Sequence, residues 1–175
     1  HLSPYDIPTL SAVLPVNNSY IANDEFTSFF VTKYWIKNTG GVLVDKKTGL
    51  IKAYRDIRKS IEDGTNLVIF PESVMSKDGK LQEFKRGGLA AAAASETTII
   101  PIYMKGTQDV IAPGNFSVNF KKTVHVIFGK PLETKSISKD DRKNIGDIVY
   151  KIMKEIEDNL DNIISEDDSV NTHLA

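Results

Sequence analysis

A histidine and an aspartate five positions apart, His1 and Asp6, are the residues of this chain best suited to proton transfer. Pro4 lies between them, and because a proline restricts its own φ and the residue before it, this segment should be extended or turned. Asp6 then occupies a helix N-cap position, with Pro8 in the first turn. The carboxylate would hold one imidazole nitrogen, leaving the other to accept a proton from a substrate hydroxyl. The alternative interpretation is an exposed histidine beside a capping aspartate.

Length and composition limit what the chain can be. With 175 residues, 41% of them hydrophobic, it can form one domain with a sizeable core. A net charge of -1 gives no overall attraction for nucleic acid, so we expect no nucleic-acid partner. The absence of cysteine excludes disulfides, thiolate nucleophiles and cysteine metal ligands. No apolar run reaches the roughly 18 residues of a membrane-spanning helix.

The chain starts directly at His1 without an initiator methionine. We therefore expect a segment of a longer protein, in which a preceding strand and any membrane anchor would position His1. Residues 1–164 are predicted to form the domain. Residues 165–175, which are rich in acidic side chains, are predicted to be a flexible tail.

The elements that must position the pair follow from hydrophobic patterning, which predicts a single α/β domain with a mainly parallel mixed sheet flanked by helices. The predicted helices are 6–14, 24–39, 53–62, 89–94 and 140–164, and the predicted strands are 19–22, 42–44, 66–70, 98–104, 116–120 and 123–128. Aromatic residues interleaved with lysines are densest in helix 24–39. This helix either packs on the sheet or lies at a membrane surface.

A second candidate site follows the strand at 66–70. Pro71 ends this strand and places Glu72 at its carboxyl end, the edge of an open α/β sheet at which ligands bind. Further on, Lys85, Arg86 and Gly87 precede an alanine-rich helix. Free N–H groups at a helix start favour an anion, whereas cations there oppose the helix dipole, so the sequence predicts an anion site. A solvated surface is the alternative.

Four separated stretches, in order, resemble the motifs of the glycerolipid acyltransferases of the lysophosphatidate acyltransferase (PlsC-like) type. His1, Ser3 and Asp6 match its His-x4-Asp motif with a serine two residues after the histidine. Residues 40–46 (GGVLVDK) are similar to Gly-x-Ile-Phe-Ile-Asp-Arg, with Lys46 in place of the arginine. The family's third and fourth motifs resemble residues 70–76 (FPESVMS) with 84–87 (FKRG), and 100–102 (IPI).

The resemblance implies a glycerol-phosphate acyltransferase-like fold and a lipid reaction. A fatty acyl group would move from a thioester, acyl-CoA or acyl carrier protein, to the hydroxyl of a lysophospholipid, above all 1-acylglycerol-3-phosphate, in phospholipid biosynthesis. His1 would be the general base and Asp6 its orienting partner. We expect membrane association at the cytoplasmic face, with no metal and no cofactor other than the thioester co-substrate.

The resemblance also implies how the acceptor is held. Glu72 would bind its glycerol hydroxyl, and Lys85 and Arg86 its phosphate. The rest of the predicted substrate-binding set is Ser73, Ser76, Gly87 and Lys46. Met75, however, stands where the family has an arginine, and a thioether cannot imitate the planar fork that arginine offers to phosphate.

Three other interpretations stay open. The acceptor is a different lysolipid or an aminolipid, which would suit Met75. A non-catalytic membrane-surface module would use the aromatic helix with Lys85 and Arg86. A copper enzyme would bind metal through His1 and His125, but this leaves the stretch at 70–76 without a role.

Overall fold

The computed structural model describes residues 3, 5–14, 18–23, 42–44, 50–74, 76, 78–110, 119 and 121–171. Several predictions lie outside these residues: helix 24–39, the strand at 116–120 except Asn119, and the positions of His1, Lys46 and Met75.

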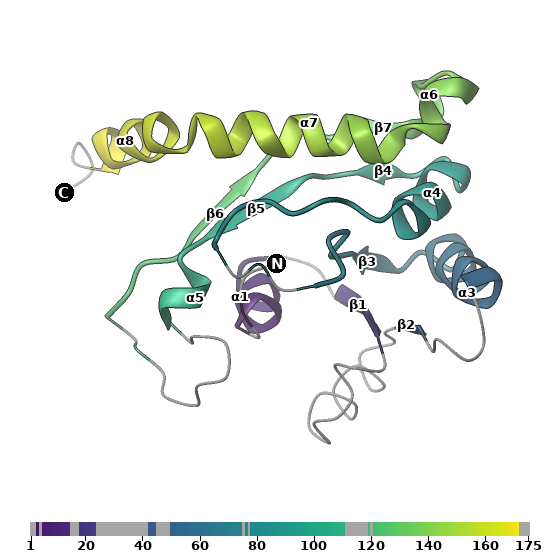
Figure 1. The fold of residues 1–175 in the computed structure, drawn as a ribbon, viewed down its shortest axis with the longest axis horizontal. Coiled ribbons are helices and arrows are strands. Elements are labelled where there is room, and N and C mark those ends of the chain that lie inside the picture. The colour runs from purple at the N-terminus through teal and green to yellow at the C-terminus, as the bar shows by residue number, and fades with distance from the viewer. Residues whose placement is uncertain are drawn as a thin grey trace.

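The first part of the chain contains a three-stranded parallel sheet (Figure 1). Its spatial order is β2 (Val42–Val44), β1 (Asn18–Asn23) and β3 (Asn66–Val68). The register aligns Ile21 with Val42 and Ser19 with Leu67. The predicted mixed α/β fold is thus confirmed, although the strand expected at 66–70 ends two residues early.

Two antiparallel strand pairs follow instead of one continuous sheet. β4 (Thr98–Ile99) pairs with β7 (Leu132–Glu133), and β5 (Ile102–Lys105) pairs with β6 (His125–Phe128). The prediction of a single strand at 98–104 is therefore wrong. Pro101 has no N–H to give to a ladder, and the chain changes its pairing partner at this residue.

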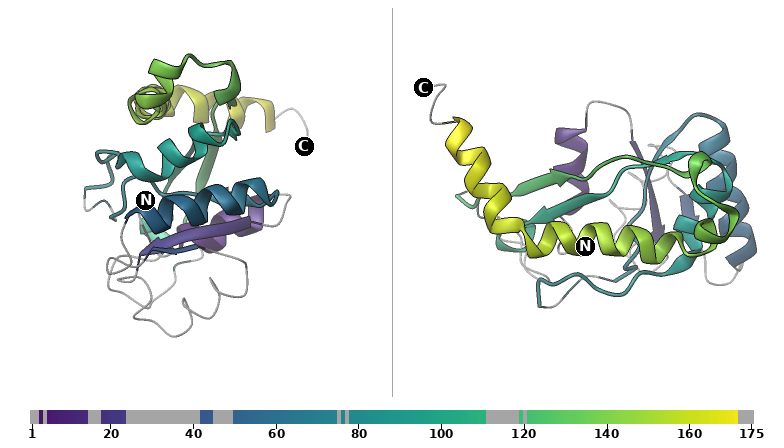
Figure 2. Two further views of the ribbon diagram at one scale, coloured as in Figure 1. Left: turned by 90° about the vertical axis from the view of Figure 1, so that its right-hand side faces the viewer. Right: turned by 90° about the horizontal axis from the view of Figure 1, so that it is seen from above.

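The alanine-rich helix α4 (Arg86–Ala94) lies between α3 (Leu50–Glu62) and α7 (Ile145–Asp158), as Figure 2 shows. One side of α4 places Ala91 against Val42 and Ile57, and another places Leu89 and Ala93 against α7. Small side chains let one helix approach neighbours on both sides. The alanine-rich helix is thus packed closely on two sides.

The last part of the chain is mostly helical. After α5 (Thr107–Val110) and η2 (Thr134–Ser136) come α6 (Lys139–Lys143), α7 and α8 (Leu160–Asn171). The single helix predicted at 140–164 is thus broken at Asn144 and at Asn159. The segment predicted to be flexible from residue 165 begins inside α8, so its first seven residues are helical. Within the described residues, no helix is both long and apolar enough to cross a bilayer.

Candidate active site

Helix α1 (Asp6–Val13) begins at the aspartate of the His-x4-Asp pattern. The N-cap residue is Tyr5, so the prediction of Asp6 as the N-cap is wrong by one position. The carboxylate of Asp6 instead reaches backwards and accepts a hydrogen bond from the backbone N–H of Ser3, 3.2 Å away. Ser3 and Asp6 are both fully buried. The Asp6 side chain therefore stabilises the turn that precedes α1 and does not cap a backbone N–H in the first turn of the helix.

Tyr20 of β1 attaches α1 to the parallel sheet. Its hydroxyl lies 2.7 Å from the hydroxyl of Ser11 and donates to the carbonyl of Ile7 at 3.3 Å. Burial raises the pKa of Tyr20, and the hydrogen bond with Ser11 partly opposes this effect. The tyrosine is therefore neutral at physiological pH, and it holds the helix that carries Asp6 against the sheet.

The turn after β3 presents the second predicted site. Glu72 is only 6% exposed, and its Oε2 accepts a hydrogen bond from the backbone N–H of Gln82 at 2.8 Å. Ser73 has a φ of +59°, the left-handed conformation that favours glycine. The family pattern has glycine at this position, where this chain has serine.

Ser76 lies inside a small polar network of the same loop. Its hydroxyl donates to Asp78 at 2.9 Å and accepts from the side-chain amide of Gln82 at 3.3 Å. Hydrogen bonds from Ser76 and from the backbone N–H of Lys80 lower the pKa of the Asp78 carboxyl. Ser76 thus helps to shape the loop that carries Glu72.

The N-terminus of α4 meets this turn. The backbone N–H of Lys85 donates to the carbonyl of Pro71 at 2.8 Å, which brings the start of the helix to the end of β3. Lys85 is the N-cap but provides no side-chain cap, and Lys85, Arg86 and Gly87 are exposed. Gly88 permits the close approach, because an added Cβ would lie 3.0 Å from the Ile69 side chain.

A largely apolar cavity of about 300 Å³ joins these elements. Leu10 and Leu14 of α1, Ala92 of α4 and residues from β3, β4, β5 and α7 line it. Among the described residues of its lining, the charged ones are Glu72 and Lys80. The cavity therefore offers an apolar interior with a carboxylate at the strand end.

The structure brings most of the predicted site residues into one region. Glu72, Ser73 and Ser76 share one loop, and Lys85, Arg86 and Gly87 start the helix bonded to it. Asp6 lies at the start of α1, the helix whose later turns line the same cavity as Glu72. Their roles in catalysis and binding stay predictions, as do those of His1 and Lys46.

Sequence reasoning missed three residues of this region: Gln82, Tyr103 and Glu157. Gln82 bonds to Glu72, and Tyr103 lines the cavity and donates to Glu157 at 3.3 Å. The position of Tyr103 directly after the IPI stretch is a weak signal. No local pattern points to Glu157.

No group of three or more histidine or acidic side chains suited to a metal ion occurs in the part of the chain that the structure describes. His125, the second ligand of the copper interpretation, lies on β6 opposite Lys105.

A family model described as Acyltransferase matches residues 1–105, more than half of the chain. The chain belongs to the Acyltransferase family. The match includes all four motif stretches, α1, the parallel sheet and α4. It ends at the last residue of β5, so α7 and α8 lie beyond it.

Named acyltransferases resemble the chain in sequence and structure. A chloroplastic 1-acyl-sn-glycerol-3-phosphate acyltransferase of Brassica napus is 29% identical over 137 residues, covering 75% of this chain and 39% of its own length. The enzyme of that name from Haemophilus influenzae is 23% identical over 160 residues, covering 88% of this chain and 64% of its own. The crystal structure of PlsC, the 1-acyl-sn-glycerophosphate (LPA) acyltransferase from Thermotoga maritima, has a TM-score of 0.64 and 25% identity, covering 90% of this chain and 64% of that one.

This acyltransferase-family chain spans less than two thirds of the length of each of these relatives.

Proposed function

We propose that the chain transfers a fatty acyl group from a thioester, on coenzyme A or acyl carrier protein, to the hydroxyl of a lysophospholipid in phospholipid biosynthesis. The acceptor that the relatives' names favour is 1-acylglycerol-3-phosphate. The observation that carries the proposal is the apolar cavity shared by α1, which starts at Asp6, and the Glu72 turn. Such a cavity suits an acyl chain whose reactive end lies near polar groups.

In the proposed reaction, His1 takes the proton of the acceptor hydroxyl as its oxygen bonds to the thioester carbonyl carbon. The carbon–sulfur bond then breaks, and the proton passes from His1 to the leaving thiolate. Asp6 orients the imidazole and stabilises its charged form, as the aspartate does in a serine hydrolase triad. The acceptor's own hydroxyl is the nucleophile, so the reaction requires no cysteine.

Acceptor binding is assigned to the Glu72 turn and the start of α4. Glu72 would hold the glycerol hydroxyl, and the exposed Lys85 and Arg86 would face the phosphate. The uncapped N-terminus of α4, with Gly87 in its first turn, supports this proposal because its N–H groups and dipole favour an anion. Lys46, Ser73 and Ser76 complete the proposed set.

Met75 favours a second candidate acceptor. Lysophosphatidate ends in a phosphate monoester, for which the family supplies an arginine at this position, and methionine has no charge to offer. A different lysolipid, or a hydroxyl on an aminolipid, would place less negative charge here. The chemistry at His1 and Asp6 would be the same for either acceptor.

Because both substrates carry long apolar chains, we also propose that the protein works at a membrane surface, on its cytoplasmic face. Binding to anionic vesicles that weakens with added salt is the expected behaviour.

The decisive experiment combines an acceptor panel with a variant of the proposed base. Lysolipids with different head groups are incubated with acyl-CoA or acyl carrier protein thioesters, and the products are identified by mass spectrometry. The His1→Ala variant should lose roughly a hundredfold to ten-thousandfold in rate. The control, His125→Ala, should keep the parent rate. No acylated product with any pair would contradict the proposed activity, and a His1→Ala rate within tenfold of the parent would remove His1 from the role of base.

A further inference from the structure

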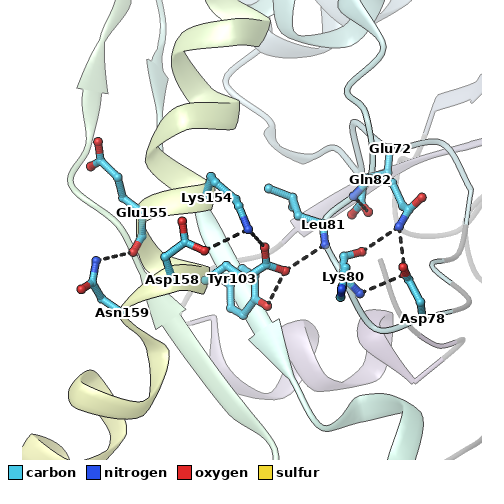
Figure 3. A network of polar contacts seen from close by, with 11 residues as sticks. Glu72, Asp78, Lys80, Leu81, Gln82, Tyr103, Lys154, Glu155, Asp158 and Asn159 are labelled. Carbon is cyan, nitrogen blue, oxygen red and sulfur yellow. Dashed lines mark hydrogen bonds and ion pairs between the residues drawn. The ribbon is translucent and has the colours of Figure 1, made fainter.

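Helix α7, which lies beyond the residues matched by the family model, holds the loop between Glu72 and Lys85. The backbone N–H of Leu81 donates to Glu157 Oε1 at 2.9 Å, across 76 residues of sequence. Figure 3 shows this network, with Leu81 of the loop, Tyr103, and Lys154 of α7 labelled. The ring of Phe84 packs edge-on against Tyr150, with ring centroids 5.2 Å apart. Tyr150 and Glu157 are seven positions apart, about two helical turns, so both contacts arise from one side of α7.

Glu157 is itself fixed in place. Lys154 binds its Oε2 at 2.7 Å, and the hydroxyl of Tyr103 donates to its Oε1 at 3.3 Å. Its side chain is 14% exposed. Burial alone would raise the pKa of Glu157, but the hydrogen bonds from Lys154 and from the Leu81 N–H outweigh this effect and lower it. The carboxylate is therefore ionised at neutral pH and is a strong hydrogen-bond acceptor.

The bonds of Glu157 and Glu72 meet at neighbouring residues of the loop. Leu81 donates its N–H to Glu157, and Gln82, the next residue, donates its N–H to Glu72. The two nitrogens belong to successive peptide units that meet at the Cα atom of Leu81, so a displacement of Leu81 also displaces the N–H of Gln82 that binds Glu72. Glu157 therefore binds the residue directly before the one whose N–H binds Glu72.

Tyr103 binds Glu157 and lines the same cavity as Glu72. Burial, followed by the charge and hydrogen bond of Glu157 and by the charge of Glu72, raises the pKa of Tyr103 to about 12. Both carboxylates thus act on one hydroxyl beside the cavity.

We propose that Glu157 is a positioning residue, which holds Leu81 so that the loop keeps Glu72 oriented toward the acceptor. The inference rests on the proposed function, because it assumes that Glu72 binds the acceptor. Under this proposal, α7 contributes to acceptor binding, although it lies outside the residues matched by the family model. It has no part in the proton transfer at His1.

The test compares Glu157→Ala, Glu157→Gln and Asp158→Ala. Asp158 is a matched control because it also binds Lys154, at 2.9 Å, one position further along α7. Loss of a hydrogen bond from a partly buried N–H should raise the acceptor KM about tenfold in Glu157→Ala, with kcat and the thioester KM unchanged. Glu157→Gln, whose amide oxygen still accepts from the Leu81 N–H, should have an acceptor KM close to that of the parent. An acceptor KM in Glu157→Ala equal to that in Asp158→Ala overturns the inference.

Hydrogen–deuterium exchange of the same variants separates this inference from the proposed function, because it requires no turnover. The amides of residues 81 and 82 should exchange faster in Glu157→Ala than in Asp158→Ala, with Glu157→Gln close to the parent. Equal exchange in the two alanine variants overturns the inference even if the parent is active. A parent that acylates no acceptor contradicts the proposed function, and with it the role of Glu157 in acceptor binding, whatever the exchange shows of the loop.

Discussion

Asp6 and Ser3 form a reciprocal pair of hydrogen bonds: the Ser3 N–H donates to the Asp6 carboxylate at 3.2 Å, and the Asp6 N–H donates to the Ser3 carbonyl at 3.1 Å. The Ser3 hydroxyl adds a third bond by accepting from the Tyr5 N–H at 3.1 Å. The turn is therefore defined by its own polar groups. These bonds fix the chain within two residues of His1.

Replacing Asp6 should affect both stability and rate. Because the carboxylate is fully buried and accepts from Ser3, Asp6→Ala should destabilise the fold by about 1–3 kcal/mol. Asp6→Asn keeps an acceptor oxygen, so it should be nearly as stable as the parent but should lose most of its transfer rate. Urea denaturation and initial rates would separate the two effects. An Asp6→Asn variant with the parent rate would show that the charge has no catalytic role.

Removing the two cations at the start of α4 should weaken acceptor binding. Lys85→Ala with Arg86→Ala should raise the KM for a phosphate-bearing acceptor more than the KM for the thioester, because both side chains are exposed beside the Glu72 turn. Lys121→Ala with Lys122→Ala, which removes two exposed lysines elsewhere, is the control. If the two double variants have the same acceptor KM, the cations at α4 have no specific role.

Two neighbouring alanines of α4 should respond differently to a larger side chain. Ala92 lines the cavity, so Ala92→Leu should fold well and shift the donor preference toward shorter acyl chains. Ala91 is fully buried against Val42 and Ile57, so Ala91→Leu should lose about 1–3 kcal/mol through overpacking. Thermal unfolding together with a series of thioester chain lengths would check both outcomes. An unchanged chain-length preference in Ala92→Leu would mean that the acyl chain lies elsewhere.

The lowered pKa of Glu157 predicts a pH dependence of stability. A carboxyl whose pKa is lower in the folded state than in the unfolded state stabilises the fold above its unfolded pKa, roughly 4.3 for glutamate, and this contribution disappears as pH falls through the folded pKa. Glu157→Gln should therefore be less stable than the parent at pH 7. The difference should shrink as the pH falls below about 4. Urea denaturation at several pH values measures it, and a difference that is constant with pH would show that the charge of Glu157 contributes nothing.

The sequence predicted best what depends on neighbouring residues. Strands β1 and β2 and the alanine-rich helix appear where apolar runs and turn residues predicted them. The turn that carries Glu72 follows its strand as predicted, although the strand ends at Val68, and the alanine-rich helix begins at Arg86, three residues before the predicted start. The N-cap was wrong by one residue because the Asp6 side chain bonds to Ser3, on the far side of the turn.

The sequence was a poor guide wherever distant segments decide the outcome. Residues 98–104 resemble one apolar strand, but the two halves find different partners, β7 and β6, on the two sides of Pro101. The hydrogen bond between Leu81 and Glu157 joins a loop to a helix 76 residues away. A leucine in a loop and a glutamate in a helix are both common, so neither residue signals the contact in the sequence. Only the folded arrangement identifies this contact.

The left-handed backbone of Ser73 has one more implication. A side chain at this φ carries a steric cost of about 1–2 kcal/mol that glycine avoids. The left-handed conformation of Ser73 is therefore imposed by its surroundings and not by the backbone preference of serine. The turn at Ser73, next to Glu72, is thus maintained by the surrounding structure. Sequence searches that require glycine at this spot would pass over chains that build the same bend.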